Sequence, residues 1–251
     1  MKLPGTNVDI IVSGYPGKSV CHGGLGWSTI ALVRNGSRSA LVDVGTFGQR
    51  ELIRRFLADM SMREGDITDV LLTHAHHDHM INWVMFDAAR IVIGQDELHW
   101  SCQQRWGSSP VPELYVKELS SWRNLCVIEA GDEVFPEMTA IAAPGHTPGG
   151  LIYYLHGENI DVIFSGDSAK NRAELISRRA DASYDAAVTR ASIDMIWELW
   201  QRRPGTILVP GHDLPMVLNE GEACYLGERN AAIKAWFGDD LETTSFFGLE
   251  I

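Results

Sequence analysis

Short apolar runs that end in turn residues alternate with stretches of helical periodicity along this 251-residue chain. Three such runs, at residues 8–12, 29–34 and 39–44, are typical of strands, and the Asn35-Gly36 pair between the last two is a turn signal. We therefore expect the fold to open with antiparallel strands.

Helical spacing follows directly. Apolar side chains at Leu52, Ile53, Phe56, Leu57 and Met60 predict an amphipathic helix over residues 48–60. A buried strand at 69–72, a short helix at 80–86 and a strand at 90–94 are expected next. Residues 95–125 carry Trp100, Trp106 and Trp122 among polar neighbours, which predicts helical pieces and a lid segment.

The second half of the chain returns to strands. Apolar or alternating runs at 126–129, 138–143, 151–155 and 160–165 predict a second sheet. A helix is expected around Ile193, Ile196, Trp197 and Trp200, then a strand at 206–209 and a final helix within 223–237. No repeat or linker interrupts this order. We expect one α/β (α+β) domain over residues 1–251, with two mixed sheets flanked by helices.

The composition excludes several classes of protein. Apolar residues make up 45% and charged residues 22% of the chain, an ordinary globular balance, and no run approaches the roughly 20 apolar residues of a membrane span. We expect no membrane association. The N-terminus has no charged segment followed by a long apolar one, so no secretory signal is visible and a cytoplasmic protein is predicted.

Net charge and cysteine content exclude further classes of partner and of metal site. A net charge of −12 opposes attraction to polyanions, so nucleic acid is not an expected partner. The four cysteines lie far apart without a Cys-x-x-Cys pair, which argues against a disulfide framework and against a cysteine-based zinc site. A small-molecule substrate remains as the expected partner, and homo-oligomers stay open.

One cluster carries the chemistry. The segment His74-Ala75-His76-His77-Asp78-His79 follows a short apolar run that resembles a buried strand. Imidazole nitrogens and carboxylate oxygens are the ligands that first-row divalent cations prefer. His74, His76, Asp78 and His79 therefore form a candidate ligand set, whereas His77 is expected to face away.

Four further candidates stand where predicted strands end. Each is Asp or His and lies within two residues of a glycine, which lets the backbone turn and aim the side chain into a shared site. They are Asp43, His146, Asp167 and His212. Their recurrence predicts a site assembled from several strand ends.

These motifs resemble those of the metallo-β-lactamase superfamily, with its His-x-His-x-Asp-His signature and its downstream His, Asp and His, over residues 8–214. The resemblance implies an αββα sandwich. It also implies that His74, His76 and His146 bind one metal, that Asp78, His79 and His212 bind a second, and that Asp167 bridges both. Asp43 would orient the ligand loop without binding metal.

Two cations about 3.5–4 Å apart acidify a shared water, and the resulting hydroxide attacks a polarised carbonyl. Asp78 could pass a proton to the leaving group. We therefore expect two divalent metal ions, zinc first and Mn²⁺ or Fe²⁺ as alternatives. The expected reaction is hydrolysis of an ester, lactone, thioester or amide.

Differences between this sequence and the motifs of individual branches of the superfamily favour some substrates over others. Asp167 disfavours antibiotic hydrolysis, because true β-lactamases of this fold generally lack the bridging carboxylate. The histidine at position 76, where the flavodiiron branch has glutamate, favours a redox-inert metal pair. The chain after His212 is too short for the helical extension of glyoxalase II. A lactone or other small cyclic ester is favoured, although the tyrosine of acyl-homoserine lactonases is missing after Asp167.

Two alternatives remain open: a glyoxalase II type thioesterase, and a mononuclear iron dioxygenase of the persulfide-oxidising type. A non-catalytic metal-binding scaffold is a third. Candidate substrate contacts are His22 and Trp27, in a glycine-rich loop, and Lys170 and Arg172, which follow Asp167 and could bind a substrate carboxylate. Turn formation and solvated charge are the competing explanations for these four residues.

Overall fold

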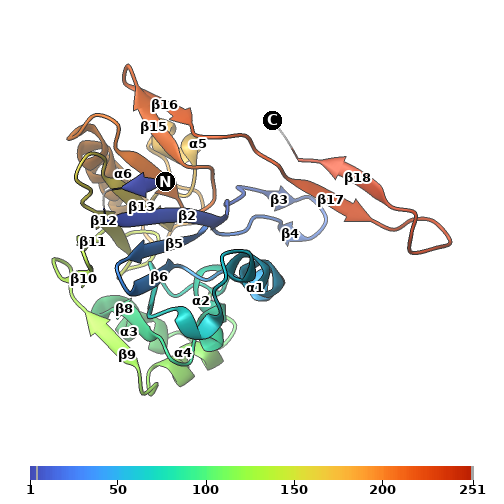
Figure 1. The fold of residues 1–251 in the computed structure, drawn as a ribbon, viewed down its shortest axis with the longest axis horizontal. Helices are drawn as coiled ribbons and strands as arrows, with labels where there is room; N and C mark the ends of the chain where they lie inside the picture. Colours follow the sequence, from blue (N-terminus) through green and yellow to red (C-terminus); the bar gives the residue numbers. More distant parts are fainter. Residues whose placement is uncertain (4, 250–251) are drawn as a thin grey trace.

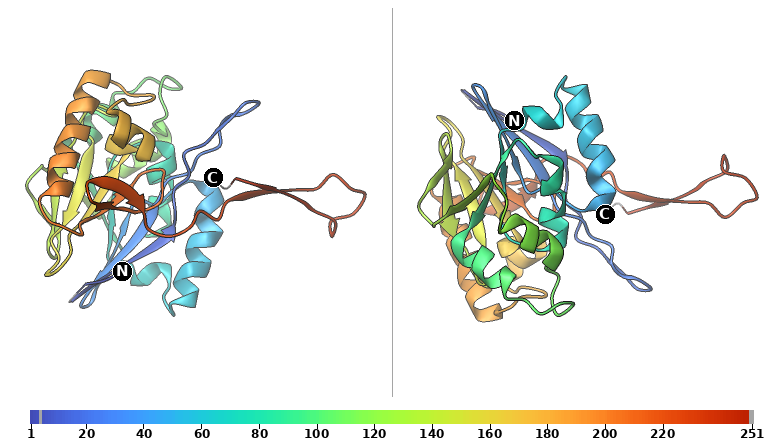
Figure 2. Two further views of the ribbon diagram at one scale, coloured as in Figure 1. Left: turned by 90° about the horizontal axis from the view of Figure 1, so that it is seen from above. Right: turned by 90° about the horizontal axis from the view of Figure 1, so that it is seen from below.

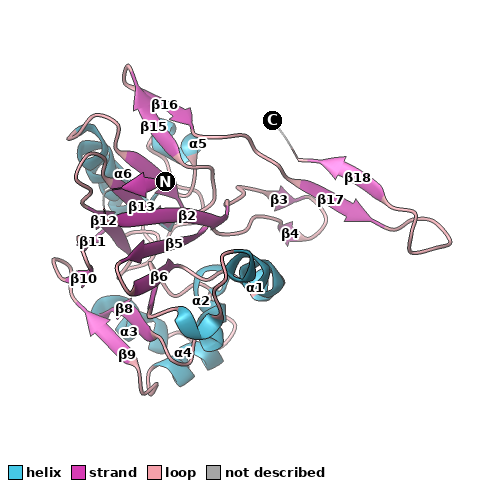
Figure 3. Cartoon of the chain, viewed as in Figure 1, coloured by secondary structure: helices cyan, strands magenta, loops and turns pink. Residues whose placement is uncertain are grey.

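Two seven-stranded sheets pack face to face in the computed structural model, which describes residues 1–3 and 5–249, and helices cover their outer sides (Figure 1 and Figure 3). The predicted αββα sandwich with two mixed sheets is confirmed. None of the helices in this described part of the chain combines the length and the apolar character that a membrane crossing needs.

The first sheet contains the N-terminal strands. In spatial order they are β1 (Lys2–Leu3), β2 (Thr6–Val12), β5 (Ile30–Asn35), β6 (Arg38–Val42), β7 (Asp69–Leu71), β8 (Arg90–Gly94) and β9 (Leu125–Ile128). Neighbours are antiparallel as far as β6 and parallel from β6 to β9. The antiparallel opening expected from the sequence is confirmed. The strand expected at 126–129 is present as β9, but its assignment to the second sheet is wrong, because it pairs in parallel with β8.

The second sheet follows in sequence. Its strands, again in spatial order, are β10 (Glu133–Phe135), β11 (Met138–Ala142), β12 (Leu151–Leu155), β13 (Val162–Gly166), β14 (Ile207–Pro210), β15 (Met216–Asn219) and β16 (Glu222–Tyr225). Only β13 and β14 pair in parallel. The carboxyl ends of this pair therefore lie at one edge of the sheet.

Helices cover the outer face of each sheet. On the first sheet lie α1 (Arg50–Asp59), α2 (His77–Met80), α3 (Gln95–Cys102) and α4 (Glu113–Leu119), with the short 3-10 helices η1 (Phe47–Gln49), η2 (Glu64–Asp66) and η3 (Ile81–Met85). The second sheet carries η4 (Asp167–Ala169), α5 (Arg172–Ser177) and α6 (Ala186–Gln201). This arrangement gives four layers.

The central strands are apolar on both faces because each face meets a different core. In β5, Ile30 and Leu32 pack toward the helices, while Ala31 and Val33 pack toward the other sheet. β12 repeats the pattern: Tyr153 contributes to the core between the sheets and Ile152 to the core under α6. Alternation in these strands thus separates two apolar environments rather than core from solvent.

Residues 95–125 contain α3 and α4, as the sequence predicted. Trp100 and Trp122 pack against the core beneath the helices, whereas Trp106 is 72% exposed. The aromatic residues of this segment are therefore divided between core and surface, and the role of the segment as a lid stays a prediction.

The predicted helix within residues 223–237 is wrong. Glu220 and Gly221 both have positive φ (51° and 86°), the backbone of a tight two-residue hairpin turn, and Ala223 continues into β16. Further along, β17 (Ala232–Ala235) pairs with β18 (Ser245–Gly248). The apolar residues of this segment have a spacing compatible with a helix, but the turn geometry and the strand pairing stabilise strands instead.

Two hairpins project from the same side of the body. One joins β3 (Lys18–Ser19) to β4 (Gly23–Gly24), and the other, much longer, joins β17 to β18 (Figure 1 and Figure 2). The longer hairpin extends well beyond the sandwich in every view.

Candidate metal centre

The side chains predicted to bind metal meet at one edge of the sandwich, where strands β7, β13 and β14 end. They are His74, His76, Asp78, His79, His146, Asp167 and His212. His74 and His76 lie on the loop between β7 and α2, and His146 lies on the loop between β11 and β12. Because parallel neighbours end at the same edge, strands distant in sequence deliver these groups to one place.

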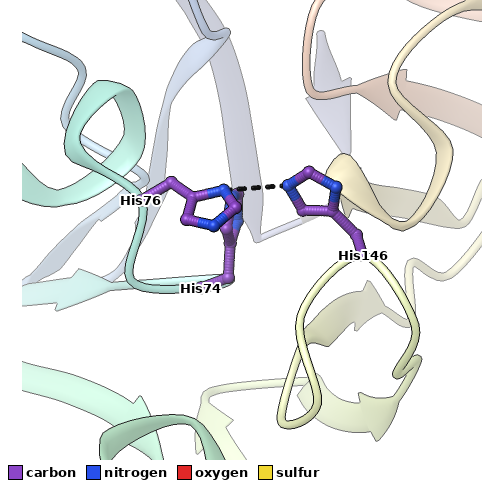
Figure 4. Close-up of side chains that lie close together, drawn as sticks. All are labelled: His74, His76 and His146. Carbon is purple, nitrogen blue, oxygen red and sulfur yellow. Dashed lines mark hydrogen bonds between the residues drawn. The ribbon is translucent and has the colours of Figure 1, made fainter. Parts of the chain in front are cut away.

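His74, His76 and His146, here called the first triad, are all buried and offer ligand atoms within 4.8 Å of one another. Nε2 of His146 lies 2.9 Å from Nδ1 of His76. Figure 4 shows the His146 ring approaching from its own loop to face the other two. One ring nitrogen from each of the three histidines therefore points into the same small volume.

Asp78, His79 and His212, the second triad, meet the same 4.8 Å criterion. Nε2 of His212 lies 3.3 Å from Oδ2 of Asp78 and 3.3 Å from Nε2 of His79. The Asp78 side chain is 21% exposed, whereas that of His79 is fully buried. Asp78 is thus the member of this triad most open to solvent.

Asp167 lies between the two triads. Its Oδ1 is 3.1 Å from Nε2 of His79 and 3.3 Å from Nε2 of His212, while Oδ2 is 3.3 Å from Nε2 of His146. Each carboxylate oxygen therefore faces a different triad. Gly211 permits this placement, because a Cβ there would lie 2.3 Å from Oδ1 of Asp167.

A nitrogen of the cluster has no partner in the described part of the protein. Nε2 of His74 is buried without a hydrogen bond, which is costly unless another group satisfies it. Nitrogen and carboxylate oxygen donors suit zinc, iron and manganese. The residues therefore fit a pair of divalent cations.

The two triads differ in protonation. Burial lowers the pKa of His74, and it lowers that of His76 to about 3 and that of His146 to about 4. The first triad is thus neutral imidazole at neutral pH, the form that binds a cation.

In the second triad the carboxylates reverse the effect. Burial alone would lower the pKa of His79 and His212, but the surrounding carboxylates, Asp167 foremost, together outweigh it: the pKa of His79 rises well above its ordinary value and that of His212 rises to about 9. Burial raises the pKa of Asp78, yet His79 and His212 together hold it below the usual range. Protons on the two histidines thus balance the carboxylates, and a cation would displace them.

Asp43 approaches His79 from behind. Its Oδ2 lies 2.7 Å from Nδ1 of His79, and the carboxylate also accepts hydrogen bonds from the backbone nitrogen and Oγ1 of Thr73, both at 2.8 Å. Since Nδ1 is engaged, Nε2 of His79 points into the cluster. This is the position that an orienting carboxylate occupies in metal sites.

Glu97, a residue that the sequence analysis did not single out, connects the two ligand loops. Its buried carboxylate accepts hydrogen bonds from the backbone nitrogens of Ala75 (2.8 Å) and Gly149 (3.2 Å). Burial raises the pKa of Glu97 to about 7. A Cβ at Gly149 would lie 2.1 Å from the backbone nitrogen of Glu97, so this contact requires glycine.

Two aromatic residues border the first triad. The Trp100 ring lies 6.2 Å from the His76 ring, and the Tyr184 ring lies 6.1 Å from Trp100. The backbone nitrogen of Tyr184 donates to the His146 carbonyl at 3.2 Å, and the side chain is 70% exposed. No motif marks Tyr184, because its place beside His146 depends on the loop before α6.

The four candidate substrate contacts have different surroundings. His22 is exposed on the β3–β4 hairpin, and Trp27 stacks on Tyr15 at 4.8 Å. Lys170 forms an ion pair with Glu174 at 2.9 Å, and its charge helps to lower the pKa of His146.

Arg172 turns away from the cluster and donates from Nε to the Ala223 carbonyl at 3.0 Å. Of the four, only Lys170 thus has a charge that acts on the cluster. His77 is exposed, as the sequence predicted.

The two helix-flanked sheets and the cluster at their edge define a metallo-β-lactamase fold with a candidate metal centre. The chain matches the model of the metallo-beta-lactamase superfamily over residues 23–212 and belongs to that superfamily. This membership indicates a metal-dependent hydrolase. No curated protein matches the chain.

Solved structures share the fold. One, from Thermotoga maritima and described as a metallo-beta-lactamase, is 23% identical, with a TM-score of 0.65 over 85% of this chain and 99% of the other. An AiiA variant from B. thuringiensis with N-decanoyl-L-homoserine at its active site is 18% identical, with a TM-score of 0.68 over 85% and 94%. AidC, a dizinc quorum-quenching lactonase, is 18% identical, with a TM-score of 0.65 over 80% and 79%. At these identities the likeness concerns the fold.

Proposed function

We propose that the protein is a dinuclear metallohydrolase that opens a lactone or another small cyclic ester. The observation that carries this proposal is the position of Asp167, whose two oxygens face different triads at 3.1–3.3 Å. A single cation would use one triad and one oxygen of Asp167, whereas two cations would use both.

The first triad with Asp167 would hold one cation, and the second triad with Asp167 the other. Two bound cations would supply Lewis acidity for the substrate carbonyl and a hydroxide nucleophile at neutral pH. The chain contributes the fixed geometry: Asp43 holds His79, and Glu97 holds the loops that carry His76 and His146.

Asp78 is suited to proton transfer. Its side chain is 21% exposed and is the part of the second triad most open to solvent and substrate. It can accept the proton of an attacking water and hand it to the leaving alkoxide. Ring opening keeps that alkoxide attached to the product and close to Asp78.

The substrate class rests on the surroundings of the site. Trp100 and Tyr184 offer apolar surface beside His76, and Lys170 places a positive charge near His146. Such a mixture suits a small ring with an apolar substituent and a polar end. AidC, which shares the fold, is a quorum-quenching lactonase. AiiA, which also shares it, holds N-decanoyl-L-homoserine at the active site of a variant.

Metal analysis and a substrate panel test this proposal. We expect two equivalents of zinc or manganese per chain and turnover of lactones. Asp167→Ala should retain the fold, lose one cation and lose most activity, while Glu118→Ala on the exposed side of α4 should change neither. Unchanged metal content and rate in Asp167→Ala would contradict the bridging role.

The alternatives give different results in the same experiment. One iron per chain with oxygen uptake would favour the mononuclear dioxygenase. Preferential turnover of thioesters would favour the thioesterase. A metal-loaded protein inactive on the whole panel would favour the scaffold.

A further inference from the structure

The C-terminal arm, residues 232–248, is apolar yet stands in solvent. It consists of β17, β18 and the turn between them, and it extends away from the sandwich (Figure 2). Phe237 is 76% exposed, Leu241 80% and Phe246 68%. An isolated two-stranded hairpin is marginally stable in water, so this arm lacks the packing that would hold it.

Both faces of the arm are apolar. Ile233 pairs with Phe247 on one face, where the Phe237 ring also lies 6.1 Å from Phe247. Lys234 pairs with Phe246 on the other face, and the Lys234 ammonium lies over the Trp236 ring. The arm extends away from its own body, so neither face is covered within one chain.

The tip of the arm is acidic. Asp239, Asp240 and Glu242 are exposed within four residues of one another. The tip therefore favours a surface with apolar contacts and positive charge, which is uncommon on a chain with a net charge of −12.

The outer side of η1 and α1 has this character. Phe47 and Leu52 are 51% and 41% exposed, and Arg55 is exposed beside them. Arg54 is exposed too but is paired with Glu64 at 2.8 Å and lies 4.0 Å from Glu51, so the positive charge open to a partner is that of Arg50 and Arg55. The Arg50 guanidinium lies 4.7 Å above the Phe47 ring. We call Phe47, Arg50, Leu52, Arg54 and Arg55 the α1 patch.

The arm leaves the body next to this patch. Leu52 lines a hollow of about 320 Å³ together with Arg229, Asn230 and Ala231, the residues that lead into β17. A two-fold axis near this hollow would bring the arm of each copy to the α1 patch of the other. The same two surfaces would then meet twice, as a symmetric dimer requires.

We propose that the arm is a dimerisation element that docks on the α1 patch of a second copy of this chain. Acidic tip residues would face the arginines, and Phe237 and Leu241 would cover Phe47 and Leu52. A second copy is favoured over other partners because it carries the complementary charge and is present wherever the arm is.

The available area supports a stable dimer. Docking of the Ile233, Phe237 and Phe247 face with Leu241 at the tip covers about four large apolar side chains per arm, at roughly 100 Å² each, and the receiving surface loses a similar area. Two reciprocal contacts would bury roughly 1,600 Å², within the range of specific interfaces.

Sedimentation equilibrium of the full chain tests this proposal. We expect a mass near twice 27.8 kDa at micromolar concentration. Phe237→Ser combined with Leu241→Ser should raise the dissociation constant about 100-fold or more. Both side chains are largely exposed, so the monomer should keep its circular dichroism. Ile176→Ser, an exposed apolar residue on α5, is the matched control and should remain dimeric.

A charge exchange tests the docking site itself. Arg55→Asp and Asp239→Lys should each weaken the dimer, and the two together should restore part of the affinity. Additive losses would overturn docking on α1, even if the arm is needed for association.

A monomeric wild-type chain, a dimer that survives the arm substitutions, or a higher oligomer would overturn the proposal. Monomer that cosediments with phosphatidylglycerol vesicles would overturn it in favour of a lipid surface. None of these outcomes depends on hydrolytic activity, so failure here is distinguishable from failure of the proposed function.

Discussion

The two triads at the sheet edge use nearly the same donor groups but hold them in opposite protonation states. His76 and His146 have pKa values lowered to about 3 and about 4 by burial, whereas the carboxylates around His212 raise its pKa to about 9. The difference shows that neighbouring carboxylates decide whether a buried imidazole is ready for a cation or must first release a proton.

The largest expected effect comes from replacing one histidine in either triad. We expect His146→Ala and His212→Ala each to retain one of two cations and to lose about a thousandfold in turnover, because both cations act on the substrate. Metal analysis of each variant with lactone kinetics measures this. Full activity in His212→Ala, with His146→Ala inactive, would favour a mononuclear centre.

The next largest effect should be a difference between the triads in the protons released when a cation binds. The His212 pKa is raised, so its proton stabilises the metal-free protein below about pH 6.5, and that contribution is lost as the pH rises through about 9. A cation entering the second triad must displace this proton. Because His79 carries a second proton that the cation must also displace, the affinity for this cation should rise about 100-fold per pH unit between about pH 6.5 and 8.5.

The first triad should show little change over the same range, because its imidazoles are already neutral. Calorimetric titration in buffers with different ionisation enthalpies measures the protons released by each cation. Equal release by both cations would contradict the assigned difference.

The smallest expected effect comes from Glu97, which serves both ligand loops. Glu97→Ala leaves the backbone nitrogens of Ala75 and Gly149 without their acceptor and should lower the free energy of unfolding by about 2–4 kcal/mol. Metal affinity should fall about tenfold. Glu97→Gln keeps one acceptor oxygen and should lose clearly less. Equal losses in both variants, measured by urea unfolding, would indicate that the charge rather than the hydrogen bonds matters.

The sequence predicted the fold well because strand-end signals are local. A polar residue next to glycine after an apolar run marks Asp43, His146, Asp167 and His212 without knowledge of tertiary structure, and all four lie at the same edge. The family resemblance then supplied a division into two triads. Both triads are compact in the structure, but so is a third group, His74, His79 and Asp167, which draws on both.

Other parts of the site could not be predicted, because tertiary packing places them. Glu97 belongs to a helix on the first sheet and meets Gly149 only when the two sheets are assembled. Arg172 shows the converse: it is five residues from Asp167 in sequence, yet its side chain turns toward Ala223. Proximity in sequence therefore did not indicate proximity in the site.

The first triad draws His74 and His76 from one sheet and His146 from the other. The second triad likewise combines Asp78 and His79 from the first sheet with His212 from the second, so each triad is complete only after the two halves of the chain have joined. The bound cations would then link the two sheets, and cation binding would indicate that the sandwich has assembled correctly. Chelation should consequently loosen the junction between the halves before it unravels either one.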